Sequence, residues 1–150
     1  MPDWRTPMSE IQIGTGRKLR EGDELAILTI GHIGNYATEV ADRLSKLGIE
    51  IGHFDMRFVK PLDEEMLHQI FSTYRKVLTV EDGCLQGGFG SAILEFMADN
   101  NYHNEIRRLG IPDAVIEHGE QIELHKECGF DPDGIENAVI EMLEAATKVS

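Results

Sequence analysis

The sequence predicts one α/β domain built on a parallel sheet with helices on both faces. Three observations support this fold class. Residues 25–30 form a continuous apolar run, which is typical of a strand covered on both faces. Apolar residues at helical spacing follow that run, and the same alternation of strand and helix recurs along the chain. The length of 150 residues is enough for one domain with a core and short for two.

The first residues precede the regular alternation. Residues 1–10 are polar, so we expect an irregular lead-in, with Trp4 as an anchor onto a domain that spans residues 11–150. Ile11 and Ile13 alternate with polar residues, ahead of a basic stretch that is flanked by glycines. This pattern predicts a short edge strand or hairpin before the main sheet.

Alternating strands and helices are predicted for the rest of the chain. A helical stripe begins at Ile33 and ends at Gly48, because glycine favours the conformation that closes a helix. We expect Asp133 to be the N-cap of the last helix. The remaining elements are predicted as a strand over 49–54, a helix over 62–71, a strand over 76–80, a helix over 89–97, a strand over 106–111, and helices over 122–128 and 135–146.

Composition and charge exclude several classes of function. The net charge of −13 argues against a nucleic-acid partner, because phosphate binding needs clustered lysine and arginine. No apolar run approaches the roughly 18 residues that span a bilayer, and Met1–Glu10 lacks the pattern of a signal peptide. Cys84 and Cys128 form no CxxC pair, and Cys84 is expected to be a small buried residue. We therefore expect no membrane partner and a cytoplasmic location.

Ligands of open parallel sheets bind beside the carboxyl ends of the strands. Residues 31–35, 81–90 and 110–113 occupy such positions, and 81–90 is the strongest candidate of the three. Its glycines allow a tight turn, and N–H groups at the start of the following helix can hold an anion. The segment matches neither a Walker A loop nor GxGxxG. A structural role, with positive φ and close packing, is therefore favoured for Gly87, Gly88 and Gly90.

Two adjacent carboxylates, Glu81 and Asp82, stand at the end of a predicted strand. Neighbours on an extended segment point to opposite faces, so the two are poorly placed to act as an acid–base pair. We expect Glu81 to cap a loop or a helix N-terminus and Asp82 to stabilise the turn.

The histidines predict no metal site. They show neither an HExxH motif nor spacing of i, i+4. His118 follows an apolar segment and is the best candidate for a functional imidazole, although a hydrogen-bonded structural or interface role is favoured for it. The six histidines are His32, His53, His68, His103, His118 and His125.

Arg57 and Lys60 flank two apolar residues ahead of Pro61. Proline at this place fixes the turn that begins the next helix, and acidic residues from Asp63 onward complement the helix dipole. The guanidinium of Arg57 can bind a buried or interfacial carboxylate through two hydrogen bonds. The alternative is an exposed ion pair that contributes little to stability.

Several motifs together resemble those of a known family. Seven segments carry the resemblance: 13–16 (Ile-Gly-Thr-Gly), 55–63, 80–83, 87–91, 110–113 (Gly-Ile-Pro-Asp), 117–119 (Glu-His-Gly), and 128–131 followed by 134–135. They resemble the C-terminal domain of the thiamine-diphosphate enzymes of the transketolase group, and within that group the 1-deoxy-D-xylulose-5-phosphate synthase family. Residues 57–63 alone are also similar to the β subunits of 2-oxoacid dehydrogenases, whereas 110–113 and 117–119 favour the synthases.

The resemblance implies a fold and a role. It implies a three-layer α/β/α domain whose mostly parallel sheet has one antiparallel edge strand, a place that the Ile11–Ile13 segment would suit. Full-length members condense pyruvate with glyceraldehyde 3-phosphate, which gives 1-deoxy-D-xylulose 5-phosphate and CO2 for isoprenoid and thiamine synthesis. Their thiamine diphosphate and Mg²⁺ are held by an earlier domain through a Gly-Asp-Gly motif, which this chain lacks. No catalytic, cofactor-binding or metal-binding residue is therefore carried over.

By the same resemblance, this chain is a C-terminal fragment, inactive alone, that supports the other domains of its parent chain and a homodimer. Two alternatives stay open: the C-terminal domain of a 2-oxoacid dehydrogenase β subunit, and a free-standing module that binds an anion at residues 87–90. Interface or loop roles are expected for Arg57, Lys60, Glu81, Asp82, Gly87, Gly88, Gly90 and His118.

Overall fold

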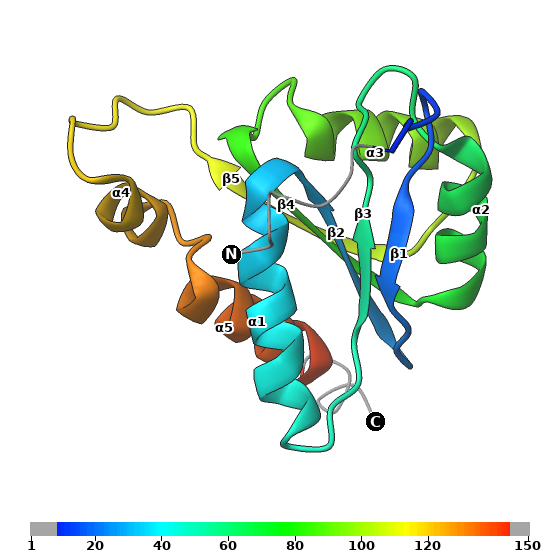
Figure 1. The fold of residues 1–150 in the computed structure, drawn as a ribbon, viewed down its shortest axis with the longest axis horizontal. Helices are drawn as coiled ribbons and strands as arrows, with labels where there is room; N and C mark the ends of the chain where they lie inside the picture. The colour runs from blue at the N-terminus through cyan, green and yellow to red at the C-terminus, as the bar shows by residue number, and fades with distance from the viewer. Residues whose placement is uncertain (1–8, 145–150) are drawn as a thin grey trace.

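The computed structural model describes residues 9–144, so Trp4 and most of the expected lead-in lie outside the described residues. A five-stranded sheet has the order β1-β3-β2-β4-β5, with β1 antiparallel and all other pairs parallel (Figure 1). The predicted α/β class with one antiparallel edge strand is confirmed. The strands are β1 (Arg17–Arg20), β2 (Leu25–Ile30), β3 (Gly52–Asp55), β4 (Lys76–Cys84) and β5 (Glu105–Ile111).

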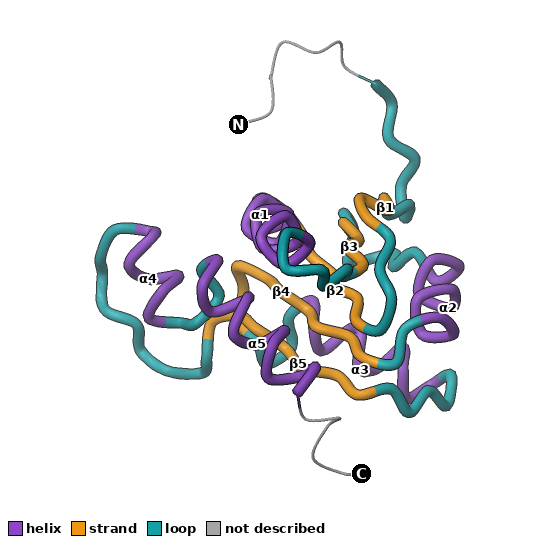
Figure 2. The backbone as a smooth tube through the Cα atoms, turned by 90° about the horizontal axis from the view of Figure 1, so that it is seen from below, coloured by secondary structure: helices purple, strands orange, loops and turns teal. Residues whose placement is uncertain are grey.

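The helices cover both faces of this sheet, as the alternation of the sequence predicts. Figure 2 shows α1 and α5 on one side of the sheet and α2 on the other. Along β2 the side chains alternate: Leu25 and Ile27 pack with α1 and α5, whereas Ala26 and Leu28 pack with α2 and α3. The helices are the 3-10 helix η1 (Gly31–Ile33), α1 (Gly34–Ser45), α2 (Glu64–Thr73), α3 (Phe89–Asp99), α4 (Gln121–Glu127) and α5 (Pro132–Glu144).

The position of the edge strand differs from the sequence prediction. Ile11 and Ile13 are exposed and lie in a loop, and the antiparallel strand is the basic stretch Arg17–Arg20. It pairs with β3, with Arg17 opposite Asp55. An edge strand buries little side-chain area, so apolar alternation is a weak guide to its place, and charges along it discourage pairing with other chains.

The N-cap of α5 also differs from the prediction. Asp133 lies inside the first turn, where it pairs with Arg43 at 2.9 Å. The cap is Asp131, whose carboxylate accepts the N–H of Gly134 at 3.0 Å. Pro132 explains this choice, because proline is favoured as the first helical residue and the cap must then precede it.

Strand β4 is longer than the sequence predicts. It continues past Val80 to Cys84, with an irregularity in its pairing to β5 between these two residues. Cys84 is exposed, contrary to the expected buried position, and it is the last residue of the strand, still paired with Ile111 of β5. Beyond β5, residues 112–120 project away from the sheet and lead into α4 (Figure 1). Among residues 9–144, no helix is long and apolar enough to cross a membrane.

Candidate functional site

The order of the strands defines where a ligand is expected. The chain passes from β2 to its neighbour β3, then returns to β4 on the opposite side of β2. The carboxyl ends of β2 and β4 therefore flank a topological switch point, the place where open α/β sheets bind ligands. His32 follows β2 within η1, and Asp82 lies near the end of β4.

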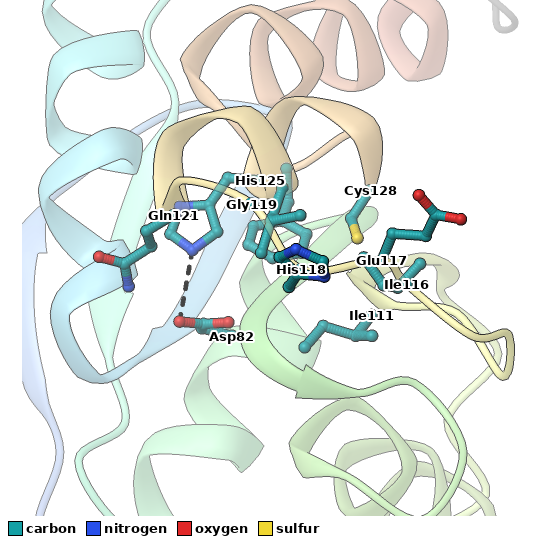
Figure 3. A pocket seen from close by; sticks show the side chains of 11 residues that line it. Asp82, Ile111, Ile116, Glu117, His118, Gly119, Gln121, His125 and Cys128 are labelled. Atoms are coloured by element: carbon teal, nitrogen blue, oxygen red, sulfur yellow. Dashed lines mark ion pairs between the residues drawn. The ribbon is translucent and has the colours of Figure 1, made fainter.

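A cavity of about 440 Å³ opens beside this switch point. It lies between the end of β4, the projecting loop 112–120 and α4 (Figure 3). Apolar side chains from β5, α4 and the loop form much of its wall. The polar side chains that line it are Asp82, Glu117, His118, Gln121 and His125.

Asp82 lies between two histidines from different segments. Its Oδ2 is 3.6 Å from Nε2 of His32 and 3.4 Å from Nε2 of His125. Figure 3 shows His125 pointing from α4 toward Asp82. The two imidazole rings lie 5.9 Å apart between centroids. We name this group, His32, Asp82 and His125, the His-Asp-His cluster.

Packing fixes the ring of His125. The side chain is buried, and its ring lies 4.8 Å from that of Phe130 and 5.7 Å from that of Tyr36, measured between centroids. The hydroxyl of Tyr36 is 3.4 Å from Nδ1. Because Nδ1 faces Tyr36, Nε2 is the nitrogen that faces Asp82.

The sequence pattern does not predict the His-Asp-His cluster. Its members lie on three segments that are far apart along the chain, so no local spacing connects them. The positions of His32 and Asp82 after adjacent parallel strands were the available signal, but adjacency of β2 and β4 is known only from the sheet order. No pattern indicated His125, because α4 is placed by tertiary packing.

Glu81 has the helix-capping role that the sequence predicts for it. Its carboxylate is buried and accepts the N–H of Phe89 at 2.7 Å and that of Gly90 at 2.8 Å, at the start of α3. A negative charge at this end of a helix is favourable. Glu81 and Asp82 thus face opposite sides of β4, as expected for consecutive residues in a strand.

The glycine-rich segment is shaped around the Glu81 carboxylate. Gly87 has a φ of +76°, and its N–H donates to Ser91 Oγ at 3.0 Å. A Cβ on Gly88 would overlap the carbonyl oxygen of Cys84 and the Glu81 carboxylate. Since the amides of Gly87, Phe89 and Gly90 are already bonded within the chain, they do not offer an anion site in this conformation.

His118 and Cys128 line the same cavity as the His-Asp-His cluster (Figure 3). His118 is exposed on the projecting loop. Burial raises the pKa of the Cys128 thiol, and the nearby carboxylates of Glu127 and Asp82 raise it further. The thiol therefore stays protonated near neutral pH, which makes it a poor nucleophile.

Arg57 and Lys60 lie apart from the cavity. Arg57 has a φ of +57°, its N–H donates to Asp55 Oδ1 at 3.2 Å, and its Nε lies 3.9 Å from Asp55 Oδ2. Arg17 binds the same carboxylate at 3.2 Å. The carboxylate partner expected for Arg57 is thus found within the chain, and an interface role stays a prediction. Lys60 is exposed.

Comparison with known proteins identifies similar sequences and folds. The family model described as "Transketolase, C-terminal domain" matches residues 14–135. A protein of Cytophaga hutchinsonii named 1-deoxy-D-xylulose-5-phosphate synthase is 63% identical over 139 residues, which is 93% of this chain and 22% of that protein. The protein of the same name from Bacteroides fragilis is 52% identical over 89% of this chain and 21% of its own length. This chain therefore spans about a fifth of the length of these relatives.

Two solved structures share the fold. One, described as a split-gene transketolase in an inactive β4 tetramer, superposes with a TM-score of 0.81 at 28% identity, over 89% of this chain and 43% of that one. The other, a transketolase from Campylobacter jejuni, has a TM-score of 0.61 at 17% identity, over 85% of this chain and 18% of that one, and shows the fold alone.

Proposed function

Because the chain belongs to the transketolase C-terminal domain family, we propose that it is the C-terminal domain of a 1-deoxy-D-xylulose-5-phosphate synthase. The 63% identity to the Cytophaga hutchinsonii protein of that name, over 93% of this chain, carries the proposal. The parent enzyme would condense pyruvate with glyceraldehyde 3-phosphate, release CO2, and supply isoprenoid and thiamine synthesis. Its proposed location is the cytoplasm.

The proposed role of this domain is structural rather than catalytic. Thiamine diphosphate and Mg²⁺ would be bound by other domains of the parent, and the sequence contains no Gly-Asp-Gly motif to hold them. Glu81, a buried carboxylate, is bonded to the start of α3 and does not fit the cofactor. The chain's own residues would hold neighbouring domains in place, which matters because catalysis depends on sub-ångström positioning.

Exposed features support contacts with other domains and with a second copy of the parent. Residues 11–150 are the proposed domain, and residues 1–10 the connection from the domain before it. Ile13, Val115 and Ile122 are large apolar side chains left exposed in the structure, and a covering partner would remove them from water. Interface roles for Arg57, Lys60 and His118 belong to the same proposal.

A chimera tests the proposal directly. In the Cytophaga hutchinsonii protein, the 139 matched residues are replaced by the matching part of this chain, and formation of 1-deoxy-D-xylulose 5-phosphate is measured. We expect activity within a few-fold of the unmodified protein and a homodimer by light scattering. The isolated 150-residue chain, given thiamine diphosphate and Mg²⁺, is expected to form no product.

The matched control carries instead the superposed part of the Campylobacter jejuni transketolase, which shares the fold at only 17% identity. We expect that chimera to be inactive, since its interface side chains differ. A chimera with this chain that folds and dimerises but makes no product would contradict the proposal. Activity of the isolated chain would contradict its structural role.

A further inference from the structure

We propose that His32, Asp82 and His125 bind a divalent transition metal ion of the zinc type. The site lies at the carboxyl ends of β2 and β4, with one ligand each from η1, β4 and α4. The proposal concerns this chain's own residues and does not depend on the activity of the parent enzyme. Among residues 9–144, this is the group of three histidine, cysteine or acidic side chains whose ligand atoms lie within 4.8 Å of one another.

The separations within the His-Asp-His cluster fit metal ligands better than hydrogen-bonded partners. The contacts of Asp82 with His32 and His125 measure 3.6 and 3.4 Å. An N–H···O hydrogen bond is shorter, at about 2.7–3.2 Å. Two ligands bound at about 2.1 Å to one tetrahedral ion lie roughly 3.4 Å apart. The ligand atoms of His32 and His125 lie within 4.8 Å of each other, so an ion bound to all three atoms would draw the two imidazole rings closer together.

The surroundings of His125 match those of a metal-binding histidine. Such residues present one ring nitrogen to the ion and fix the ring through a polar partner at the other. The Tyr36 hydroxyl faces Nδ1 at 3.4 Å, which is long for a hydrogen bond, so the packing of Tyr36 and Phe130 against the ring is what holds its orientation. Nε2 is thereby directed at the place where the ion would bind. This arrangement lowers the entropy lost on binding, because the buried ring is already ordered.

The type of ligand selects the type of ion. Two imidazoles and one carboxylate suit zinc and its first-row neighbours, whereas Mg²⁺ and Ca²⁺ require mainly oxygen ligands. Three protein ligands leave one position for water or for a group from another molecule. His32 is the exposed member of the cluster, with a side chain 55% accessible, so that position would open toward solvent on its side.

Titration calorimetry with zinc chloride on the EDTA-treated 150-residue chain tests the proposal. We expect one saturable zinc ion per chain. His32→Gln and Asp82→Asn should each weaken binding at least about ten-fold, because each removes a ligand. His32→Gln is the cleaner variant, since the side chain is exposed and its loss leaves the core unchanged. Cobalt(II) supplies a second readout through its visible absorption when bound by nitrogen and oxygen ligands.

Two control variants separate this site from adventitious binding. His103→Gln removes an exposed histidine that is remote in sequence from the cluster, and Cys84→Ser removes the exposed thiol. Both are expected to bind zinc as the unmodified chain does. The proposal is overturned if the unmodified chain shows no saturable binding at millimolar zinc. It is equally overturned if folded His32→Gln and Asp82→Asn bind zinc with unchanged affinity.

Discussion

The carboxylate of Glu81 accepts a hydrogen bond from the N–H of Gly90, nine positions later in the sequence, at 2.8 Å. The second oxygen accepts the N–H of Phe89 at 2.7 Å. One side chain at the end of β4 thus satisfies two of the N–H groups that a helix N-terminus leaves without partners. The Glu81 carboxylate thus connects β4 to α3. It occupies the helix N-terminus, a position where other α/β proteins bind an external anion.

Replacing Glu81 by glutamine should destabilise the domain. The amide keeps one acceptor oxygen, but its NH2 group would face an N–H donor in a buried place. We expect a loss of about 2 kcal/mol in the free energy of unfolding, measured by urea denaturation. Glu95→Gln is the matched control, because Glu95 is exposed on α3 and should change stability little. Equal effects of the two substitutions would contradict the capping role.

Alanine at Gly88 should cost more stability than alanine at Gly87. A Cβ on Gly88 would overlap backbone and the Glu81 carboxylate, neither of which can move without breaking the cap. A Cβ on Gly87 meets open space, so its cost is the strain of φ +76°, about 1 kcal/mol. Thermal unfolding of both variants measures the difference. A larger loss for the Gly87 variant would show that backbone strain, not close packing, governs this turn.

Thr79→Val should stabilise the domain. The hydroxyl of Thr79 is buried without a hydrogen-bond partner among residues 9–144, and valine has nearly the same shape. Removing the unsatisfied group should add about 1 kcal/mol to the free energy of unfolding.

Thr29→Val is the opposite case. The Thr29 hydroxyl is equally buried but bonds to His53 Nε2 at 3.0 Å. We expect this variant to lose stability, so the two substitutions should differ in sign in the same denaturation experiment. Destabilisation by Thr79→Val would imply a partner for its hydroxyl.

His53 should make the domain less stable in mild acid. Burial, the main cause, lowers the pKa of His53 to about 4, and the nearby charges of Arg20 and Arg17 act in the same direction against the opposing effect of Asp55. In the unfolded chain the pKa is about 6.5. As pH falls from about 6.5 to 4, the unfolded state therefore binds a proton that the folded state does not. The free energy of unfolding therefore has its full value above about pH 6.5. It decreases as the pH falls to 4, by about 3 kcal/mol in total.

Two measurements check this pH dependence. An NMR titration of the ring should show His53 uncharged down to a pH near 4. In denaturation between pH 7 and 4, the variant His53→Gln should lose less stability than the unmodified chain, because it lacks the titrating group while all carboxylates remain. A His53 ring that titrates near pH 6.5 would contradict the predicted exclusion of the charge.

The elements that the sequence predicted well are those with strong periodicity. The apolar run of β2 and the stripe of α1 were found nearly at their observed bounds, because each is covered by other elements and so must be apolar at fixed spacing. The wrong predictions concern the edge strand of the sheet and the ends of helices and strands. β1 is exposed and charged, and the cap of α5 depended on the preference of Pro132 for the first helical position.

The candidate site was predicted only in part. The role of Glu81 followed from its position between a strand and a helix, which is local information. The contacts of Asp82 could not be predicted from local information. Asp82 was expected to stabilise a turn, whereas in the structure it faces two histidines from other segments. A carboxylate partner was predicted for Arg57, but this partner is Asp55, which lies only two residues away in the sequence.

The sequence by itself determined the fold class and the family, because both are encoded in periodicity and in short motifs that need no knowledge of distant neighbours. Only the tertiary structure decided which side chains share a site. The placement of β4 beside β2 brings Asp82 to His32, and the packing of α4 against Tyr36 and Phe130 adds His125. The order of the strands and the packing of the helices depend on the sum of many weak contacts between distant residues. A local sequence pattern therefore cannot predict them.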